Sequence, residues 1–179
     1  METTSHSIKA QLNADLSLHN TQLVVGFIGH DEEKFAALMQ LVTPEEGRIA
    51  GRAAWVMEKV AAQHPALLIP YLNKLIQILP AAQNDALKRH ILKQLTLYPL
   101  VEEELGFLYE YSMEVLLSKR ERVAAKIYAM QLMYQISTIE PDLKPELMVL
   151  IESRYNTGSP GYKNRASKLL KKLSKEIGS

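Results

Sequence analysis

Residues 52–60 read RAAWVMEKV, and residues 165–173 repeat the same pattern as RASKLLKKL. Each stretch opens with Arg-Ala and then places three apolar residues on one face of a helix, since positions i, i+1 and i+4 cluster at 3.6 residues per turn. The two apolar triads are Val56, Met57 and Val60, and Leu169, Leu170 and Leu173. The sequence therefore contains a helical unit that recurs.

Two further triads lie between these: Ile91, Leu92 and Leu95, and Leu132, Met133 and Ile136. The four copies are spaced by 35, 41 and 37 residues, within the period of roughly 20 to 50 residues that is typical of repeat proteins. Prolines 65 and 141 follow the first and third copies, and each precedes a second amphipathic helix, because proline is accepted in the first turn of a helix. The unit is a helical hairpin, which must stack on its neighbours to bury its apolar stripe.

Apolar residues recur at helical spacing through the rest of the chain, and no segment alternates apolar and polar residues as a strand would. We therefore predict an all-α fold, a right-handed α-α superhelix (solenoid) of about four helical hairpins. Residues 1–179 are predicted to form one domain, with residues 1–20 as an N-terminal extension and residues 21–177 as the helical repeats. Residues 43–46, Thr-Pro-Glu-Glu, have the pattern of a capping box and predict a helix that begins at Pro44.

This hairpin, whose second helix opens with a basic residue and small alanines, resembles the repeat of the HEAT and armadillo-like superfamily. The resemblance pairs residues 35–39 with 48–60, 65–79 with 85–95, 101–117 with 122–136, and 141–151 with 163–173 as four HEAT-like hairpins. It implies a scaffold that binds a protein or peptide partner on a concave face. The chain is also distantly similar to the HEAT-like DNA alkylation repair glycosylases, whose concave face holds aromatic and acidic residues against damaged DNA.

Composition limits the classes of function. Hydrophobic residues make up 47% and charged residues 23% of the chain, as in a folded soluble protein, and the net charge of +1 gives no broad field for nucleic acid or membrane. The first eleven residues are polar, and no stretch approaches the roughly 20 apolar residues of a spanning helix. The absence of cysteine excludes disulfides and thiolate metal sites. We predict a cytoplasmic protein that needs no membrane, metal or cofactor.

If the triads point into the stack, the side chains between them face a groove. The repeat register then predicts these ligand-binding residues: Arg52, Trp55 and Lys59 from the first copy; His90 and Gln94 from the second; Tyr128, Gln131 and Gln135 from the third; Arg165, Lys168 and Lys172 from the fourth. Leu87 is the one apolar residue that interrupts this polar series.

Trp55 stands out in that register. Its counterparts His90, Gln131 and Lys168 are polar, whereas a core position should stay apolar in every copy. We therefore expect Trp55 to be partly exposed and to anchor a peptide or a base. The alternative is that Trp55 packs over a neighbouring hairpin.

Basic residues gather where the second helices begin: Arg48, Lys88, Arg89, Arg122 and Lys163. Stacked repeats would align them into a stripe that could hold phosphates or an acidic peptide, and such binding weakens as salt rises. The alternative is ordinary solvated surface charge.

Enzyme motifs are absent. The sequence has no His-Glu-x-x-His helix, no Gly-x-Ser-x-Gly elbow and no glycine-rich phosphate loop. Residues 158–164, GSPGYKN, are superficially similar to the flexible loop of the fumarase and adenylosuccinate lyase superfamily, but the second serine, the methionine and the spacing differ, which argues against a lyase. A glycosylase needs a carboxylate near the extruded base, and Glu58 and Asp85 are the only acidic residues near Trp55 in the register. We predict a non-enzymatic scaffold for a protein or peptide; the alternative is a nucleic-acid-binding protein, with or without glycosylase activity.

Overall fold

The computed structural model describes residues 2–178 of the chain. In this range the backbone forms ten α-helices and five short 3-10 helices, and no strand. The all-α class and the helical-repeat organisation are therefore confirmed. By their contacts the helices form two compact units, Met1–Gln94 and Leu95–Ser179, called here the N-terminal and C-terminal units.

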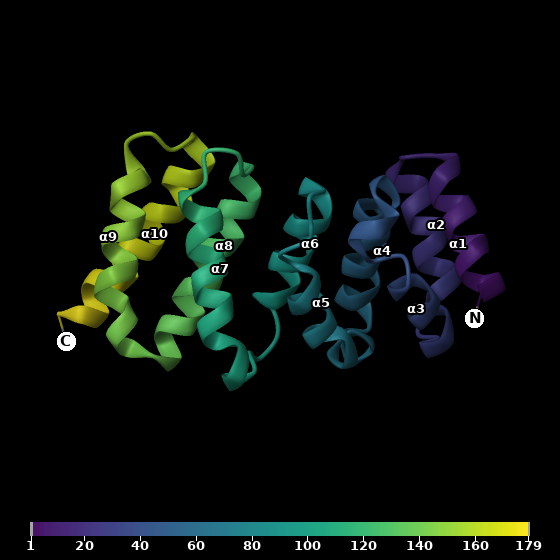
Figure 1. Cartoon of the computed structure of the whole chain (residues 1–179), viewed down its shortest axis with the longest axis horizontal. Helices are drawn as coiled ribbons and strands as arrows, with labels where there is room; N and C mark the ends of the chain where they lie inside the picture. Colours follow the sequence, from purple (N-terminus) through teal and green to yellow (C-terminus); the bar gives the residue numbers. More distant parts are fainter. Residues whose placement is uncertain (1, 179) are drawn as a thin grey trace. The chain divides into compact units, whose positions relative to one another are not determined.

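The N-terminal unit is centred on its fourth helix. Its elements are α1 (Glu2–Ala14), α2 (Leu18–Ile28), α3 (Glu32–Met39), η1 (Pro44–Glu46), α4 (Arg48–Gln63), η2 (Pro65–Leu67), η3 (Ile69–Tyr71), α5 (Leu72–Ile78) and α6 (Asp85–Leu95), whose last residue begins the C-terminal unit. Helix α4 contacts α1, α2 and α3, which lie beside one another in Figure 1.

The C-terminal unit consists of two helical hairpins. Its elements are η4 (Glu102–Glu104), α7 (Leu105–Leu117), α8 (Val123–Ile139), η5 (Pro141–Leu143), α9 (Lys144–Tyr155) and α10 (Pro160–Ile177). Helix α7 packs on α8, α9 packs on α10, and α8 also contacts both helices of the second hairpin (Figure 1). Along the chain, the predicted second helices of the four pairs are α4, α6, α8 and α10.

The apolar triads form the core. Those of α4, α6 and α8 are buried completely or almost so, as are Leu169 and Leu173 of α10. Leu170 is the exception, because it remains partly open to solvent. The predicted inward face of each repeated helix is thus confirmed, and each buried apolar side chain contributes about 1.5–3 kcal/mol to the free energy of unfolding.

The predicted start of α4 at Pro44 is wrong. Residues 44–46 form a 3-10 turn, and Gly47 then adopts a positive φ of 54°, so the α-helix begins at Arg48. Glycine reaches this backbone conformation without a steric penalty. Thr43 makes no capping bond to the backbone, and Glu46 forms an ion pair of 2.7 Å with Lys9 of α1 instead of completing a capping box.

Residues 2–14, predicted to be an extension, form a helix that packs against α2, α3 and α4. Ile8 and Leu12, four residues apart, are both buried. Asn20 of α2 donates to the backbone carbonyls of Gln11 and Asp15 at 2.8 and 2.7 Å, which joins the two helices. The polar character of this segment concealed the helix, since two apolar positions give only a weak helical pattern.

Helices α4 and α6 approach closely at Gly51. A Cβ added there would lie 2.8 Å from Asn84 Oδ1 and 2.9 Å from the Cβ of Ala86. Replacing Gly51 with Ala should therefore lower the free energy of unfolding by about 1–3 kcal/mol, because the helices must separate. The matched change Gly26→Ala in α2, where nothing lies within 4 Å, should raise it by about 0.5–1 kcal/mol. Urea unfolding measures both; equal effects of the two changes would contradict the close approach.

Candidate functional site

The N-terminal unit contains a cleft of about 460 Å³, called here the basic cleft. It is lined by Leu16, Arg48, Gly51, Arg52, Trp55, Asn84, Ala86, Arg89 and His90. Helix α4 contributes residues at positions i, i+3, i+4 and i+7, which share one face, and α6 contributes residues at i, i+3 and i+4. The predicted residues Arg52, Trp55 and His90 therefore meet Arg48 and Arg89 of the predicted basic stripe.

Asn84 fixes the wall of the basic cleft. Its Oδ1 accepts hydrogen bonds from the backbone N–H groups of Ala86 and Leu87 at 2.9 and 3.0 Å, and so caps the start of α6. Its Nδ2 donates to the carbonyl of Gly47 at 3.1 Å, just before α4. One side chain thereby links the beginnings of the two helices that carry the arginines.

The charge in the basic cleft is uncompensated. Arg48 is exposed and pairs with no described residue. Arg52 donates through Nη1 to the carbonyl of Leu12, in the last turn of α1 where a cation is favoured, and its buried Nε has no hydrogen-bond partner among residues 2–178. Arg89 donates to Nε2 of His90 at 2.9 Å. No carboxylate is among the residues that line the cleft, so it favours an anionic ligand.

His90 is held by a polar network behind the cleft. Because its Nε2 accepts from Arg89, the ring proton lies on Nδ1, which donates to Oε2 of Glu58 at 2.6 Å. Lys93 donates to the other oxygen of Glu58. Burial of Glu58 opposes its ionisation, but the hydrogen bonds from His90 and Lys93 outweigh burial and lower the pKa of Glu58 to about 2. This carboxylate is thus ionised, and both of its oxygens are engaged.

The predicted groove residues on α6 are largely buried. His90 and Gln94 are only 3% and 2% exposed, and Leu87 is fully buried. These three residues stand at i, i+3 and i+7, so they share one face, which packs into the core and reaches the basic cleft only at His90. Trp55 is partly exposed as expected. Lys59 and Lys88 are also partly exposed, but neither lines the basic cleft.

The predicted residues of the C-terminal unit do not form a comparable site. Tyr128, Gln131 and Gln135 share a face of α8, and Arg165, Lys168 and Lys172 share a face of α10. The C-terminal unit has one cleft beside Lys119 and Lys126 and another beside Glu110 and Glu146, and none of these predicted residues lines either of them, nor do Arg122 and Lys163. Gln135 donates to the carbonyl of Thr96 at 2.9 Å, and the Lys172 ammonium lies 5.3 Å from the ring centre of Tyr134. A single trough along all four copies stays a prediction.

Residues 158–164, which contain the lyase-like motif, form the start of α10 and the two residues before it. Ser159 precedes α10, and its Oγ accepts a hydrogen bond from the backbone N–H of Tyr162 at 3.3 Å. Serine followed by proline is a common way to begin a helix. Within residues 2–178 no group of three or more His, Asp or Glu side chains is placed to hold a metal ion, and none of the helices described is long and apolar enough to cross a membrane.

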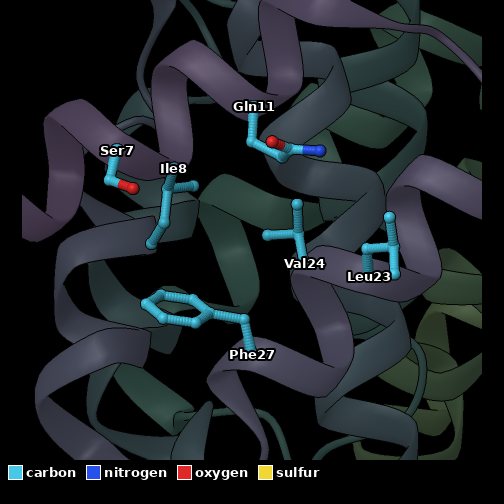
Figure 2. Close-up of a pocket in the computed structure, with 6 residues that line it drawn as sticks. All are labelled: Ser7, Ile8, Gln11, Leu23, Val24 and Phe27. Carbon is cyan, nitrogen blue, oxygen red and sulfur yellow. The ribbon is translucent and has the colours of Figure 1, made fainter.

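Sequence analysis missed an apolar cleft of about 290 Å³ between α1 and α2. Figure 2 shows Ile8 of α1 and Phe27 of α2 on opposite sides of the hollow. Leu23 and Phe27 are 52% and 49% exposed, and the Lys34 ammonium lies 4.7 Å from the centre of the Phe27 ring. The cleft was missed because residues 1–20 were predicted to be an extension. Residues 23–28 are apolar at almost every position, and this could have indicated that they have apolar side chains on more than the buried face of their helix.

Comparison with known proteins gives one match. A family model described as HEAT repeat domain matches residues 8–173, which include parts of both units. No curated protein matches the chain, and no solved structure does.

The lowered pKa of Glu58 predicts how stability depends on pH. Because the folded pKa of about 2 lies below the ordinary value of 4.5, the ionised carboxylate stabilises the fold above pH 4.5, and this contribution is lost as the pH falls towards 2. Glu58→Gln should therefore reduce stability at pH 7 and flatten the decline between pH 4.5 and pH 2. Urea unfolding at several pH values measures this, with exposed Glu152→Gln on α9 as the control. Parallel curves for wild type and Glu58→Gln would contradict the assignment.

Proposed function

We propose that this chain, which belongs to the HEAT-repeat family, is a non-enzymatic scaffold that binds an acidic segment of a protein partner in the basic cleft. One observation carries the proposal: three arginines and a partly exposed tryptophan line a cleft that contains no carboxylate. Guanidinium groups bind carboxylates through paired, charge-assisted hydrogen bonds. Tryptophan and arginine are also the residues that most often dominate binding energy at protein interfaces.

The geometry favours a peptide over an extruded base. A glycosylase site needs a free carboxylate beside its aromatic residue, whereas Glu58 is held by His90 and Lys93. The net charge of +1 is small for a protein that wraps nucleic acid. Arg52, already fixed on the end of α1, provides a pre-arranged cation at the back of the cleft. We further propose a cytoplasmic location, which rests on the absence of cysteine from the sequence.

The partner would place one acidic side chain near Arg48 and Arg89 and an apolar side chain near Trp55. Arg48 and Arg89 come from different helices, so only a ligand that enters between α4 and α6 engages both. Leu16, which is exposed, adds apolar surface from the segment between α1 and α2. An acidic peptide with interspersed leucines has this combination of groups.

Substitution of the arginines tests the proposal. Trp55 is the only tryptophan in the chain, so its fluorescence reports directly on occupancy of the basic cleft. We expect a peptide of alternating glutamate and leucine to change this fluorescence, and Arg48→Gln and Arg89→Gln each to weaken binding about tenfold through loss of a charged hydrogen bond. Lys88→Gln, next to Arg89 but outside the cleft, is the matched control.

The same titration distinguishes the alternatives. The peptide with glutamine in place of glutamate should bind at least tenfold more weakly than the acidic peptide. Duplex DNA is titrated in parallel at two salt concentrations. Tighter binding of DNA than of the acidic peptide at physiological salt, lost in Arg48→Gln, would overturn the proposal in favour of nucleic acid.

Trp55→Ala separates an anchor from a packing residue. Loss of a central aromatic contact should weaken peptide binding at least tenfold, while the melting temperature falls only modestly because the side chain is partly exposed. A labelled peptide and fluorescence anisotropy are used, since this variant has no tryptophan. A large fall in melting temperature with unchanged affinity would show that Trp55 serves packing alone.

A further inference from the structure

The C-terminal unit contains a cleft of opposite charge. It has a volume of about 610 Å³ and lies where α7, the end of α8 and the start of α9 meet; we call it the acidic cleft. Four glutamates line it, at positions 102, 110, 140 and 146, and no basic residue does. Leu105 and Ile136, both buried, provide an apolar floor.

The four glutamates have charge available for a ligand. Their side chains are exposed, and none of them forms an ion pair with any residue that the structure describes. They come from η4, α7, the residue after α8, and α9. Repulsion among four carboxylates around one cleft costs free energy, which a bound cation would relieve.

A second feature of the acidic cleft is the hydroxyl of Tyr109. This side chain is only 6% exposed, and its buried oxygen has no hydrogen-bond partner within residues 2–178. Burial and the negative charge of Glu146 raise the pKa of Tyr109 to about 12. The hydroxyl is therefore neutral at physiological pH, and it interacts electrostatically with the Glu146 carboxylate. A buried hydroxyl without a partner is costly, and native proteins rarely leave one without a reason.

Gly106 shows that the space above α7 is open. It lines the acidic cleft one turn before Tyr109, and a Cβ added at this position would meet nothing within 4 Å. A larger side chain at position 106 would therefore enter the cleft without disturbing the packing of the helix.

We propose that the acidic cleft binds a lysine or arginine side chain of a basic segment in a protein partner. The apolar stem lies on Leu105 and Ile136, and the cationic head lies among the glutamates, where an N–H of the ligand donates to the Tyr109 oxygen. The charge of the cleft selects a cation, and its apolar floor accommodates the methylene stem that carries the charged head of a lysine or arginine.

Fluorescence anisotropy tests this proposal. A labelled peptide of alternating arginine and leucine is titrated with the full chain. We expect binding at least tenfold tighter than that of the same peptide with glutamine in place of arginine. Gly106→Leu should abolish binding because leucine fills the cleft. Gly26→Leu is the matched control, since this helical glycine also has open space around it, and should bind as wild type does.

Tyr109→Phe distinguishes a ligand contact from a structural role. Because the hydroxyl has no partner in the folded chain, its removal should leave the melting temperature unchanged or raise it, while affinity for the basic peptide falls about fivefold. A lower melting temperature with unchanged affinity would show that the hydroxyl serves the fold and would overturn its role in binding.

Three outcomes would overturn the proposal as a whole. They are equal binding of the arginine and glutamine peptides, undiminished binding by Gly106→Leu, and tighter binding of the polyamine spermine than of the peptide. The proposal does not depend on the basic cleft, since Arg48→Gln should leave basic-peptide binding unchanged. Failure at either cleft is thus distinguishable from failure at the other.

Discussion

The burial of an apolar stripe on each repeated helix is the constraint on which the structure depends. A single helix cannot remove its apolar stripe from water, so α4, α6, α8 and α10 must turn that stripe towards neighbouring helices. Burial of the stripe fixes the rotation of each helix about its own axis. On α4, burial of Val56, Met57 and Val60 leaves Arg52 and Trp55 on an adjoining face, where they line the basic cleft.

The repeated triads were sufficient to predict the fold class, and their register singled out Arg52 and Trp55, two of the α4 residues that line the basic cleft. On α6 the register transferred from α4 assigns to the groove residues that are largely buried, and Leu87 is an apolar residue at one of these positions. Leu87, His90 and Gln94 share this buried face, and the burial of His90 is tolerated because its ring hydrogen-bonds Glu58. The sequence therefore contained an indication that this face of α6 is buried, because Leu87 is the one apolar residue in the polar series.

Other features required packing that sequence periodicity does not contain. The start of α4 depends on the positive φ of Gly47, and the packing of α1 depends on Ile8 and Leu12 alone among many polar residues. The acidic cleft joins Glu102 and Glu110 to Glu140 and Glu146, which are far apart along the chain. Local pattern does not join these residues, and only the packing of α7 on α8, together with that of α9 on α8, brings the carboxylates to one cleft.

The bond from Arg52 to the carbonyl of Leu12 makes the first helix part of the energetics of the basic cleft. Under the proposed function, an anion that engages Arg52 would share this side chain with the Leu12 carbonyl, so anion binding and the packing of α1 would be thermodynamically linked. By reciprocity, whatever displaces α1 changes affinity by the same factor by which the ligand changes the docking of α1. The N-terminal helix is thus joined to the basic cleft through a single side chain.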